Sequence, residues 1–316
     1  MLDVKTILAW MTIALCAPAA DLRVGVIGTD TSHVPAFAKL LNGDPNAPDH
    51  IAGARLVAAY KGGSKDIPDS ANRVDGFAED VRTKYGVEIV TDIATLLSKV
   101  DVVLLTSLDG RVHLEQAKPV IAAHKPLFID KPLAATLEDA REIARLAKEA
   151  GTPWFSSSSL RFGSIDAAMK IPGLTGATTW GPGPFEAHHP LELAWYAIHP
   201  VELLYTIMGT GCESVTRISG ENADVIVGRW KDGRIGTVNA VRPYSDYGAV
   251  AFKGRETVES HPKSGATDYR PLVVEMVKFF QTGKPPVPNG ETLEIFAFMD
   301  AAQRSKEQGG KPVALR

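Results

Sequence analysis

Residues 25–33 read GVIGTDTSH, and this stretch decides the fold. It begins inside an apolar run at residues 22–27 and is followed by VPAFAKLLN at residues 34–42, which has a helical pattern. A strand, a glycine turn and a helix in this order form the pyrophosphate-binding turn of dinucleotide-binding proteins. That turn reads G-x-G-x-x-G, whereas here Asp30 and His33 stand at the second and third glycine positions. This departure decides whether a dinucleotide can bind.

Composition limits the classes of function. The chain has 316 residues, of which 45% are hydrophobic and 22% charged, so it is long enough for two globular cores. A net charge of −3 and the absence of a basic run argue against nucleic acid as a partner. We therefore expect small-molecule chemistry, with no membrane association once the N-terminal segment is removed.

The N-terminal 20 residues have the pattern of a secretory signal peptide. Lys5 precedes the apolar stretch TILAWMTIALCA, and the small residues APAA at positions 17–20 suit cleavage near Ala19 or Ala20. A buried first helix or a misassigned start is the alternative. We expect a periplasmic or secreted protein, in which Cys212 is the cysteine that remains after cleavage.

Strand and helix patterns alternate strictly from residue 21 to about residue 152. Apolar strands are predicted at 55–60, 87–90, 101–107 and 126–130, with helices near 75–85, 92–98, 112–124 and 137–150. A polar loop, KGGSKDIPDS, occupies residues 61–70. Such alternation predicts an α/β fold with a doubly wound parallel sheet, the Rossmann architecture.

Strands and helices no longer alternate in residues 153–316. Five β-rich segments are separated by glycine and polar turns, at 177–185, 213–220, 223–230, 234–241 and 247–254. Helices are predicted near 195–208, 269–282 and 291–308. We expect an α+β domain with a largely antiparallel, open sheet, and a ligand cleft between it and the first domain.

Four motifs resemble the glucose-fructose oxidoreductase and inositol dehydrogenase (Gfo/Idh/MocA) family. They are VGVIG at 24–28, TSLDGRVHLEQA at 106–117, IDKPLA at 129–134 and WYAIHPVELLYTIMG at 195–209. The resemblance implies an NAD(P)-dependent oxidoreductase that transfers hydride between a sugar or polyol carbinol and nicotinamide. It also implies a homo-oligomer formed through the open sheet.

The resemblance places the cofactor in the turn at 28–33, where two interpretations of Asp30 remain open. In one, Asp30 caps its own helix and repels the pyrophosphate. In the other, Asp30 points away while hydroxyl groups of the turn hold the phosphates. The expected cofactor-binding residues are Gly28, Thr29, Asp30, Thr31, Ser32, His33, Lys61, Ser107, His113 and Lys131.

The end of the second predicted strand lacks the acid that binds the ribose hydroxyls of NAD. Lys61 stands there instead, within a loop that also contains Ser64 and Lys65. These residues suit the 2′-phosphate of NADP, or form a solvated loop. The choice between NAD and NADP stays open.

Lys131 and His199 match the catalytic lysine and histidine of the family. Lys131 follows a buried strand, and a partly desolvated lysine at that position stabilises an alkoxide or passes a proton. His199 suits proton transfer from a hydroxyl group because its ordinary pKa is near neutrality. Trp195 stands where the family has an acid. We expect its ring either to stack on a sugar or to pack in the core.

Further residues are assigned to the substrate side of the cleft. Arg161 matches a family arginine, and the segment EAHHP adds two histidines; the expected substrate residues are Arg161, His188, His189, Trp195 and Tyr196. We predict no metal site, since these histidines lack a recognised ligand spacing. Two alternatives to the oxidoreductase remain: a lyase or epimerase that uses bound cofactor transiently, and an exported polyol-binding protein without dinucleotide.

Overall fold

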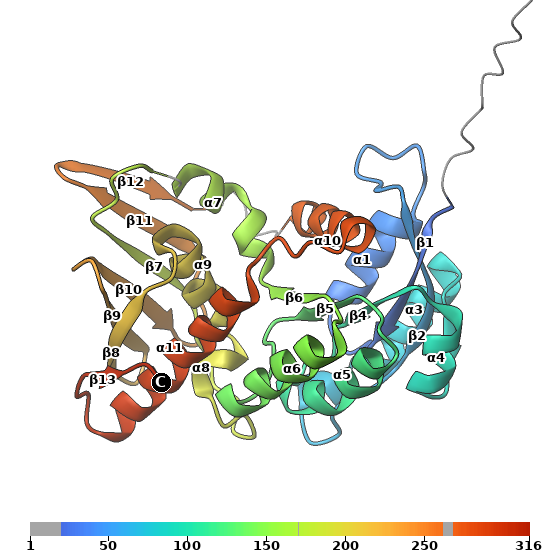
Figure 1. Cartoon of the computed structure of the whole chain (residues 1–316), viewed down its shortest axis with the longest axis horizontal. Coiled ribbons are helices and arrows are strands. Elements are labelled where there is room, and N and C mark those ends of the chain that lie inside the picture. The colour runs from blue at the N-terminus through green and yellow to red at the C-terminus, as the bar shows by residue number, and fades with distance from the viewer. Residues whose placement is uncertain (1–19, 170, 262–267) are drawn as a thin grey trace, which may run out of the picture.

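The computed structural model describes residues 20–169, 171–261 and 268–316. Two sheets lie side by side, each with its own helices (Figure 1). The segment expected to be a signal peptide lies, up to residue 19, outside the described residues. Within the described residues, the structure contains no helix with the length and apolar character needed to cross a bilayer.

The first sheet is six-stranded and parallel, with strand order β3-β2-β1-β4-β5-β6. Its strands are β1 (Leu22–Ile27), β2 (Ala54–Tyr60), β3 (Glu88–Val90), β4 (Val102–Leu105), β5 (Leu127–Asp130) and β6 (Trp154–Ser157). This order is that of the Rossmann fold and confirms the prediction. We expect the first domain to end at residue 152, but the next strand, β6, also belongs to this sheet.

The helices of the first half are close to their expected positions, except for the short α2, which overlaps the segment expected to be a polar loop. They are α1 (His33–Asn42), α2 (Pro68–Ala71), α3 (Val74–Tyr85), α4 (Ile93–Lys99), α5 (His113–Ala122) and α6 (Leu137–Ala150). Helix α6 shows why the sequence located them well. Thr136 caps its start by accepting from Asp139 N, and Gly151 ends it with a φ of 66°. Ile143 and Ala147 bury one face, so the apolar period and both ends are local signals.

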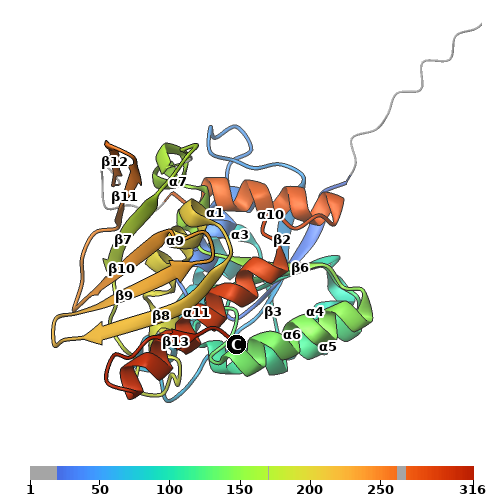
Figure 2. The same cartoon turned by 60° about the vertical axis from the view of Figure 1, so that its left-hand side comes forward.

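The second sheet has seven strands in the order β12-β11-β7-β10-β9-β8-β13. They are β7 (Gly176–Pro182), β8 (Cys212–Ser219), β9 (Ala223–Trp230), β10 (Ile235–Val241), β11 (Gly248–Lys253), β12 (Glu256–Ser260) and β13 (Val313–Ala314). All neighbours are antiparallel except β7 and β10. Both views place α9 (Ile198–Met208) and α11 (Asn289–Glu307) on one face (Figure 2). The short helices α7 (Ser164–Met169) and α8 (Glu192–Trp195) precede α9.

Helix α10 (Arg270–Thr282) returns from the second half and packs on the first sheet. Its buried residues Leu272, Met276 and Phe279 share one core cluster with Val26 of β1 and Phe37 of α1. Figure 1 shows α10 lying over α1. The residue just before α10, Tyr269, is thereby brought to the start of α1.

Candidate active site

A polar cavity of about 150 Å³ lies where the β1–α1 turn meets the end of β5 and the start of α9. Tyrosines and ionisable groups dominate its wall: Tyr196, Tyr244, Tyr247, Tyr269, His33, Arg73, Lys131 and His199. Pockets for drug-sized ligands usually measure about 300–1,000 Å³. The cavity therefore suits one small polar ring or a short polyol.

Lys131 follows β5 directly and is buried, with 9% of its surface exposed. Within the described residues its Nζ has no hydrogen bond, and it lies 5.6 Å from the centre of the Tyr196 ring. Burial lowers the pKa of Lys131, and the charge of Asp130 offsets part of this effect. An amine that gives up its proton more readily than usual thus faces the cavity.

His199 lies in the first turn of α9 and is also buried. Its Nδ1 and the hydroxyl of Ser158 are hydrogen-bonded at 2.7 Å. Burial, followed by the charges of Lys131 and His33, holds the pKa of His199 well below its ordinary value. The imidazole is therefore neutral at pH 7. The structure brings the two residues predicted to be catalytic into one cavity.

A second histidine, His33, reaches the same cavity from the start of α1. Its Nδ1 lies 2.5 Å from Oδ2 of Asp130, the last residue of β5. The backbone N–H of Lys131 donates to the other oxygen of Asp130. Burial by itself raises the pKa of Asp130, but the charges and hydrogen bonds of His33 and Lys131 lower it overall. The sequence predicts a cofactor contact for His33, whereas the structure pairs it with Asp130, whose only sequence signal is an acid directly before Lys131.

The carboxylate of Asp30 points away from its own helix. It accepts hydrogen bonds from Ser70 Oγ at 2.6 Å and from the backbone N–H of Leu108 at 3.1 Å. Ser32, not Asp30, occupies the N-cap position of α1, and its side chain makes no capping hydrogen bond. The helix-cap interpretation of Asp30 is therefore wrong, because the carboxylate is satisfied by partners from other loops.

Residues 61–74, which we call the covering segment, lie against the β1–α1 turn. The backbone N–H of Thr29 donates to Lys61 O at 2.7 Å, and the Thr29 hydroxyl donates to Val74 O at 2.9 Å. Ser64 Oγ donates to Asp109, which follows β4. A Cβ built on Gly62 would lie 3.2 Å from the Cα of Gly28. The covering segment is thus in direct contact with the first glycine of the turn.

This turn does not fit a dinucleotide pyrophosphate in the manner of the glycine motif. The second glycine allows the backbone to approach the phosphates, whereas Asp30 places a buried carboxylate there. The hydroxyl of Thr29 is used within the protein, which removes one of the expected phosphate ligands. Gly62 of the covering segment approaches the Cα of Gly28, and Ser107 lies on the side where a Gly28 side chain would point. Thr31, Ser32 and His33 line the small cavity instead.

Three other residues expected to bind the cofactor have partners within the protein. Lys61 Nζ pairs with Asp75 at the surface, at 2.8 Å. The two ring nitrogens of His113 are hydrogen-bonded to the carbonyls of Leu133 and Ser107. Ser107 Oγ donates to Gln116 at 2.7 Å. His113 is buried and joins the loops after β4 and β5, which is a structural role.

Of the residues assigned to the substrate, only Tyr196 lines the cavity. Arg161 is buried in ion pairs with Glu202 and Glu291, at 2.8 and 2.7 Å. His188 is half exposed and pairs with Glu186, while Nδ1 of His189 is hydrogen-bonded to Leu191 O. Trp195 stacks near His189, with ring centres 5.8 Å apart. None of these four residues lines the cavity, a distinction that spacing along the chain does not reveal.

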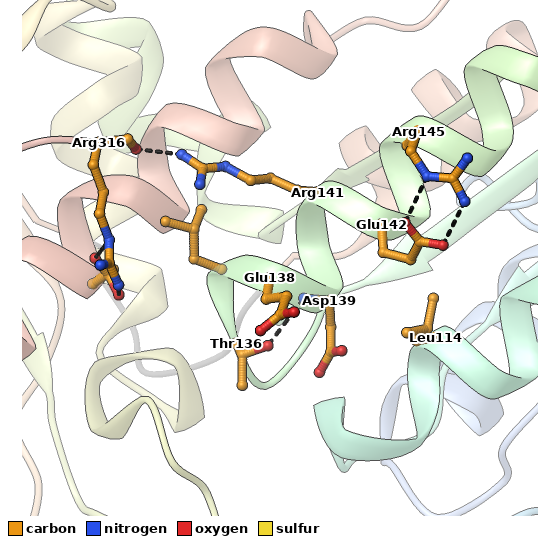
Figure 3. Close-up of a pocket in the computed structure, with 10 residues that line it drawn as sticks. Leu114, Thr136, Glu138, Asp139, Arg141, Glu142, Arg145 and Arg316 are labelled. Carbon is orange, nitrogen blue, oxygen red and sulfur yellow. Dashed lines mark hydrogen bonds and ion pairs between the residues drawn. The ribbon is translucent and has the colours of Figure 1, made fainter.

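A larger hollow of about 810 Å³ lies elsewhere, along α6 (Figure 3). Two of its arginines form ion pairs: Arg145 with Glu142 at 2.6 Å, and Arg316 with Asp300 at 3.2 Å. The Arg141 guanidinium donates to the carbonyl of Arg316. This groove holds no group comparable to the unpaired lysine of the smaller cavity. Among the described residues, no cluster of three or more His, Cys, Asp or Glu side chains has the arrangement of a metal site.

Residues 22–157 match the family model GFO_IDH_MocA, described as "Oxidoreductase family, NAD-binding Rossmann fold". The match assigns the first domain, residues 22–157, to the Gfo/Idh/MocA family. The resemblance seen in the sequence motifs is confirmed. The family is one of NAD-binding oxidoreductases, although the turn of this member departs from the glycine motif.

Two curated relatives share parts of the chain. 1,5-Anhydro-D-fructose reductase of Ensifer adhaerens is 38% identical over 90 residues, which cover 28% of this chain and 27% of that protein. Inositol 2-dehydrogenase of Paracoccus denitrificans is 33% identical over 137 residues, or 41% of this chain and 34% of that protein. Both matches therefore span about a third or less of the relative.

The fold extends further than the sequence matches. Myo-inositol dehydrogenase of Lactobacillus casei, solved with NAD(H) and myo-inositol, has a TM-score of 0.72 to this chain. The likeness covers 94% of this chain and 97% of that structure at 17% identity. At this identity it shows the fold, including the second sheet, and the predicted fold class is confirmed.

Proposed function

We propose that this Gfo/Idh/MocA protein binds a small sugar or polyol and exchanges the proton of one hydroxyl group, as part of a sugar or polyol oxidoreductase reaction. The observation that carries the proposal is the shared cavity of Lys131 and His199. The cavity has the size of one small ring, and its tyrosines offer hydroxyl groups to a polyol. The names of the two curated relatives support a carbinol as the reacting group.

The chain's own residues supply proton transfer and charge stabilisation. His199 is neutral at pH 7 and lines the cavity, so it can hydrogen-bond the reacting hydroxyl group. Lys131 lies beside it and stabilises the alkoxide that forms, since a cation acts more strongly in a water-poor site. Tyr196, below the lysine amine, orients the ring of the substrate.

NAD or NADP is the hydride acceptor that the family implies, which makes an NAD(P)-dependent dehydrogenase the first candidate. The turn carries Asp30 at the second glycine position, and its Thr29 hydroxyl is bonded to the covering segment, so it does not hold a dinucleotide in the manner of the glycine motif. This observation favours a second candidate, in which the same cavity binds a polyol without a dinucleotide. That candidate is a polyol-binding protein, whereas a lyase or epimerase that uses bound cofactor transiently still requires a dinucleotide.

A substrate survey tests the first candidate against the second. Purified protein is mixed with a panel of sugars and polyols, including myo-inositol, and with NAD⁺ or NADP⁺, and reduced cofactor is recorded at 340 nm. We expect Lys131→Ala and His199→Ala each to lower turnover by roughly 100- to 10,000-fold. His188→Ala, outside the cavity, is the matched control and should keep the wild-type rate.

The same survey identifies the alternatives. Conversion of a sugar without net reduction of cofactor would favour a lyase or epimerase. Binding of a polyol without any conversion would favour the binding protein. Wild-type rates in Lys131→Ala or His199→Ala would refute the assignment of these residues.

A further inference from the structure

His33, the first residue of α1, and Asp130, the last residue of β5, form a hydrogen-bonded pair at the wall of the cavity. His33 Nδ1 and Asp130 Oδ2 are 2.5 Å apart, and the two side chains are 10% and 4% exposed. The His33 ring also packs against Tyr269, with ring centres 4.8 Å apart. The His33 ring is therefore held on two sides, by the Asp130 carboxylate and by the Tyr269 ring.

This pairing determines which nitrogen of His33 can act as a base. A carboxylate only accepts hydrogen bonds, so the short contact requires the proton of the neutral imidazole on Nδ1. Nε2 then carries the lone pair. Within the described residues Nε2 of His33 has no hydrogen-bond partner, and the residue lines the cavity.

Among the described residues, His33 has a negatively charged group beside it, and His199 does not. A base becomes a cation when it takes a proton, so it requires a nearby negative charge. His33 has the Asp130 carboxylate at hydrogen-bond distance, whereas His199 Nδ1 is bonded to a neutral hydroxyl and lies near the charge of Lys131. A carboxylate that can stabilise an imidazolium therefore lies beside His33, whereas the partner of His199 is an uncharged hydroxyl.

We propose that His33 is the general base of this cavity and that Asp130 is its positioning residue. The inference deepens the proposed function and rests on a substrate hydroxyl lying in the cavity. In the step, the substrate O–H bond breaks and an Nε2–H bond forms on His33, which gives an alkoxide and an imidazolium. Asp130 stabilises the imidazolium, and Lys131 and a neutral His199 remain to stabilise the alkoxide.

The position of His33 in the sequence supports this role. It stands at the third glycine of the motif, where the family packs helix against strand, and its ring instead reaches the end of β5. One substitution therefore removes a feature of the phosphate-binding turn and adds a base to the cavity. The two effects share a cause, which is a large side chain at the start of α1.

The tautomer of His33 is tested without any substrate. Full-length mature protein is labelled with ¹⁵N-histidine, long-range ¹H–¹⁵N spectra are recorded near pH 8, and His33→Gln assigns the signals. We expect wild-type His33 with its proton on Nδ1. In Asp130→Asn the amide can donate to Nδ1, so the proton should move to Nε2. A wild-type His33 protonated on Nε2 would overturn the proposal.

The second arm measures turnover with any sugar or polyol that the survey identifies. His33→Gln should lower kcat by roughly 100- to 10,000-fold with a smaller change in KM. Asp130→Asn should lower kcat by as much as about 10,000-fold, since it leaves the wrong tautomer. A kcat of His33→Gln within threefold of wild type, together with loss of activity in His199→Gln, would overturn the proposal and leave the proposed function intact.

The surface pair of His188 and Glu186 supplies the matched control. It has the same geometry, with Nδ1 and the carboxylate 2.7 Å apart, but lies outside the cavity and is half exposed. Glu186→Gln removes the charge from a histidine–carboxylate pair of the same type. It should leave kcat unchanged, and an equal loss of kcat in Glu186→Gln and Asp130→Asn would count against the proposal.

Discussion

Ser70 donates a hydrogen bond of 2.6 Å to the carboxylate of Asp30, and both side chains are fully buried. Ser70 belongs to the covering segment, and Asp30 stands at the second glycine position of the turn. The backbone N–H of Leu108 donates to the other oxygen of Asp30. One carboxylate therefore joins the turn, the covering segment and the loop after β4. The residue that departs from the glycine motif also holds the segment that lies over it.

We expect Asp30→Gly to bind dinucleotides at least ten times more tightly than the wild type. The substitution removes a negative charge next to the pyrophosphate position and releases Ser70, so the covering segment can move. Calorimetric titration with NAD⁺, NADH and NADPH measures the difference. Asp75→Ala is the control, because Asp75 also pairs with the covering segment but at the surface. Micromolar binding by the wild type, unchanged in Asp30→Gly, would contradict this prediction.

The buried carboxylate of Asp30 should also affect stability as pH changes. Burial raises its pKa above the ordinary 3.8, although Ser70 and Leu108 lower it in part. The folded protein therefore holds this proton more tightly than the unfolded chain, and the free energy of unfolding falls as pH rises through the raised pKa. Asp30→Asn lacks this loss, so its stability relative to wild type should increase between about pH 4 and pH 7. Urea unfolding across this range measures the difference, and a constant difference would refute it.

Arg161 should be required for stability. It joins Glu202 and Glu291 while only 9% of its side chain is exposed, so Arg161→Met leaves two buried carboxylates without a cation. We expect a loss of roughly 3–5 kcal/mol in urea unfolding. Arg145 also lies between two glutamates but is half exposed, so Arg145→Met should cost far less stability than Arg161→Met. Equal costs for the two variants would show that burial does not determine the effect.

The open face of the second sheet is the surface that we propose for homo-oligomer formation. Ile218, Ile235 and Phe252 are exposed on its strands, with 63%, 55% and 38% of their surfaces accessible. Apolar side chains grouped on a sheet face favour association. Light scattering after size-exclusion chromatography should show an oligomer that Ile235→Glu dissociates. A wild-type monomer at micromolar concentration would refute this proposal.

Export remains a prediction from the N-terminal sequence. The mature chain should begin near Ala20 or Asp21 and be recovered from the periplasm or the medium. N-terminal sequencing of protein from its native host measures this. An intact Met1 would show that the segment is retained.

The order of strands and helices in the first half follows from local signals. Apolar periods, the Thr136 cap and the Gly151 turn act over a few residues, so the sequence by itself predicts α6 and its neighbours closely. The same reasoning predicted most of the second sheet. It did not predict that α10 packs on the first sheet, because an apolar helix face does not specify which of two cores will bury it.

The candidate site divides in the same way. Lys131 and His199 could be named from sequence because each lies in a motif with its own local pattern. The pairing of His33 with Asp130 joins residues 97 positions apart, and that of Asp30 with Ser70 joins residues 40 apart. Such contacts depend on the paths of loops and on side-chain rotamers, which only the packed structure determines. The sequence therefore located a turn with an unusual aspartate and histidine, and the tertiary structure decided that the aspartate holds the covering segment and the histidine faces the cavity.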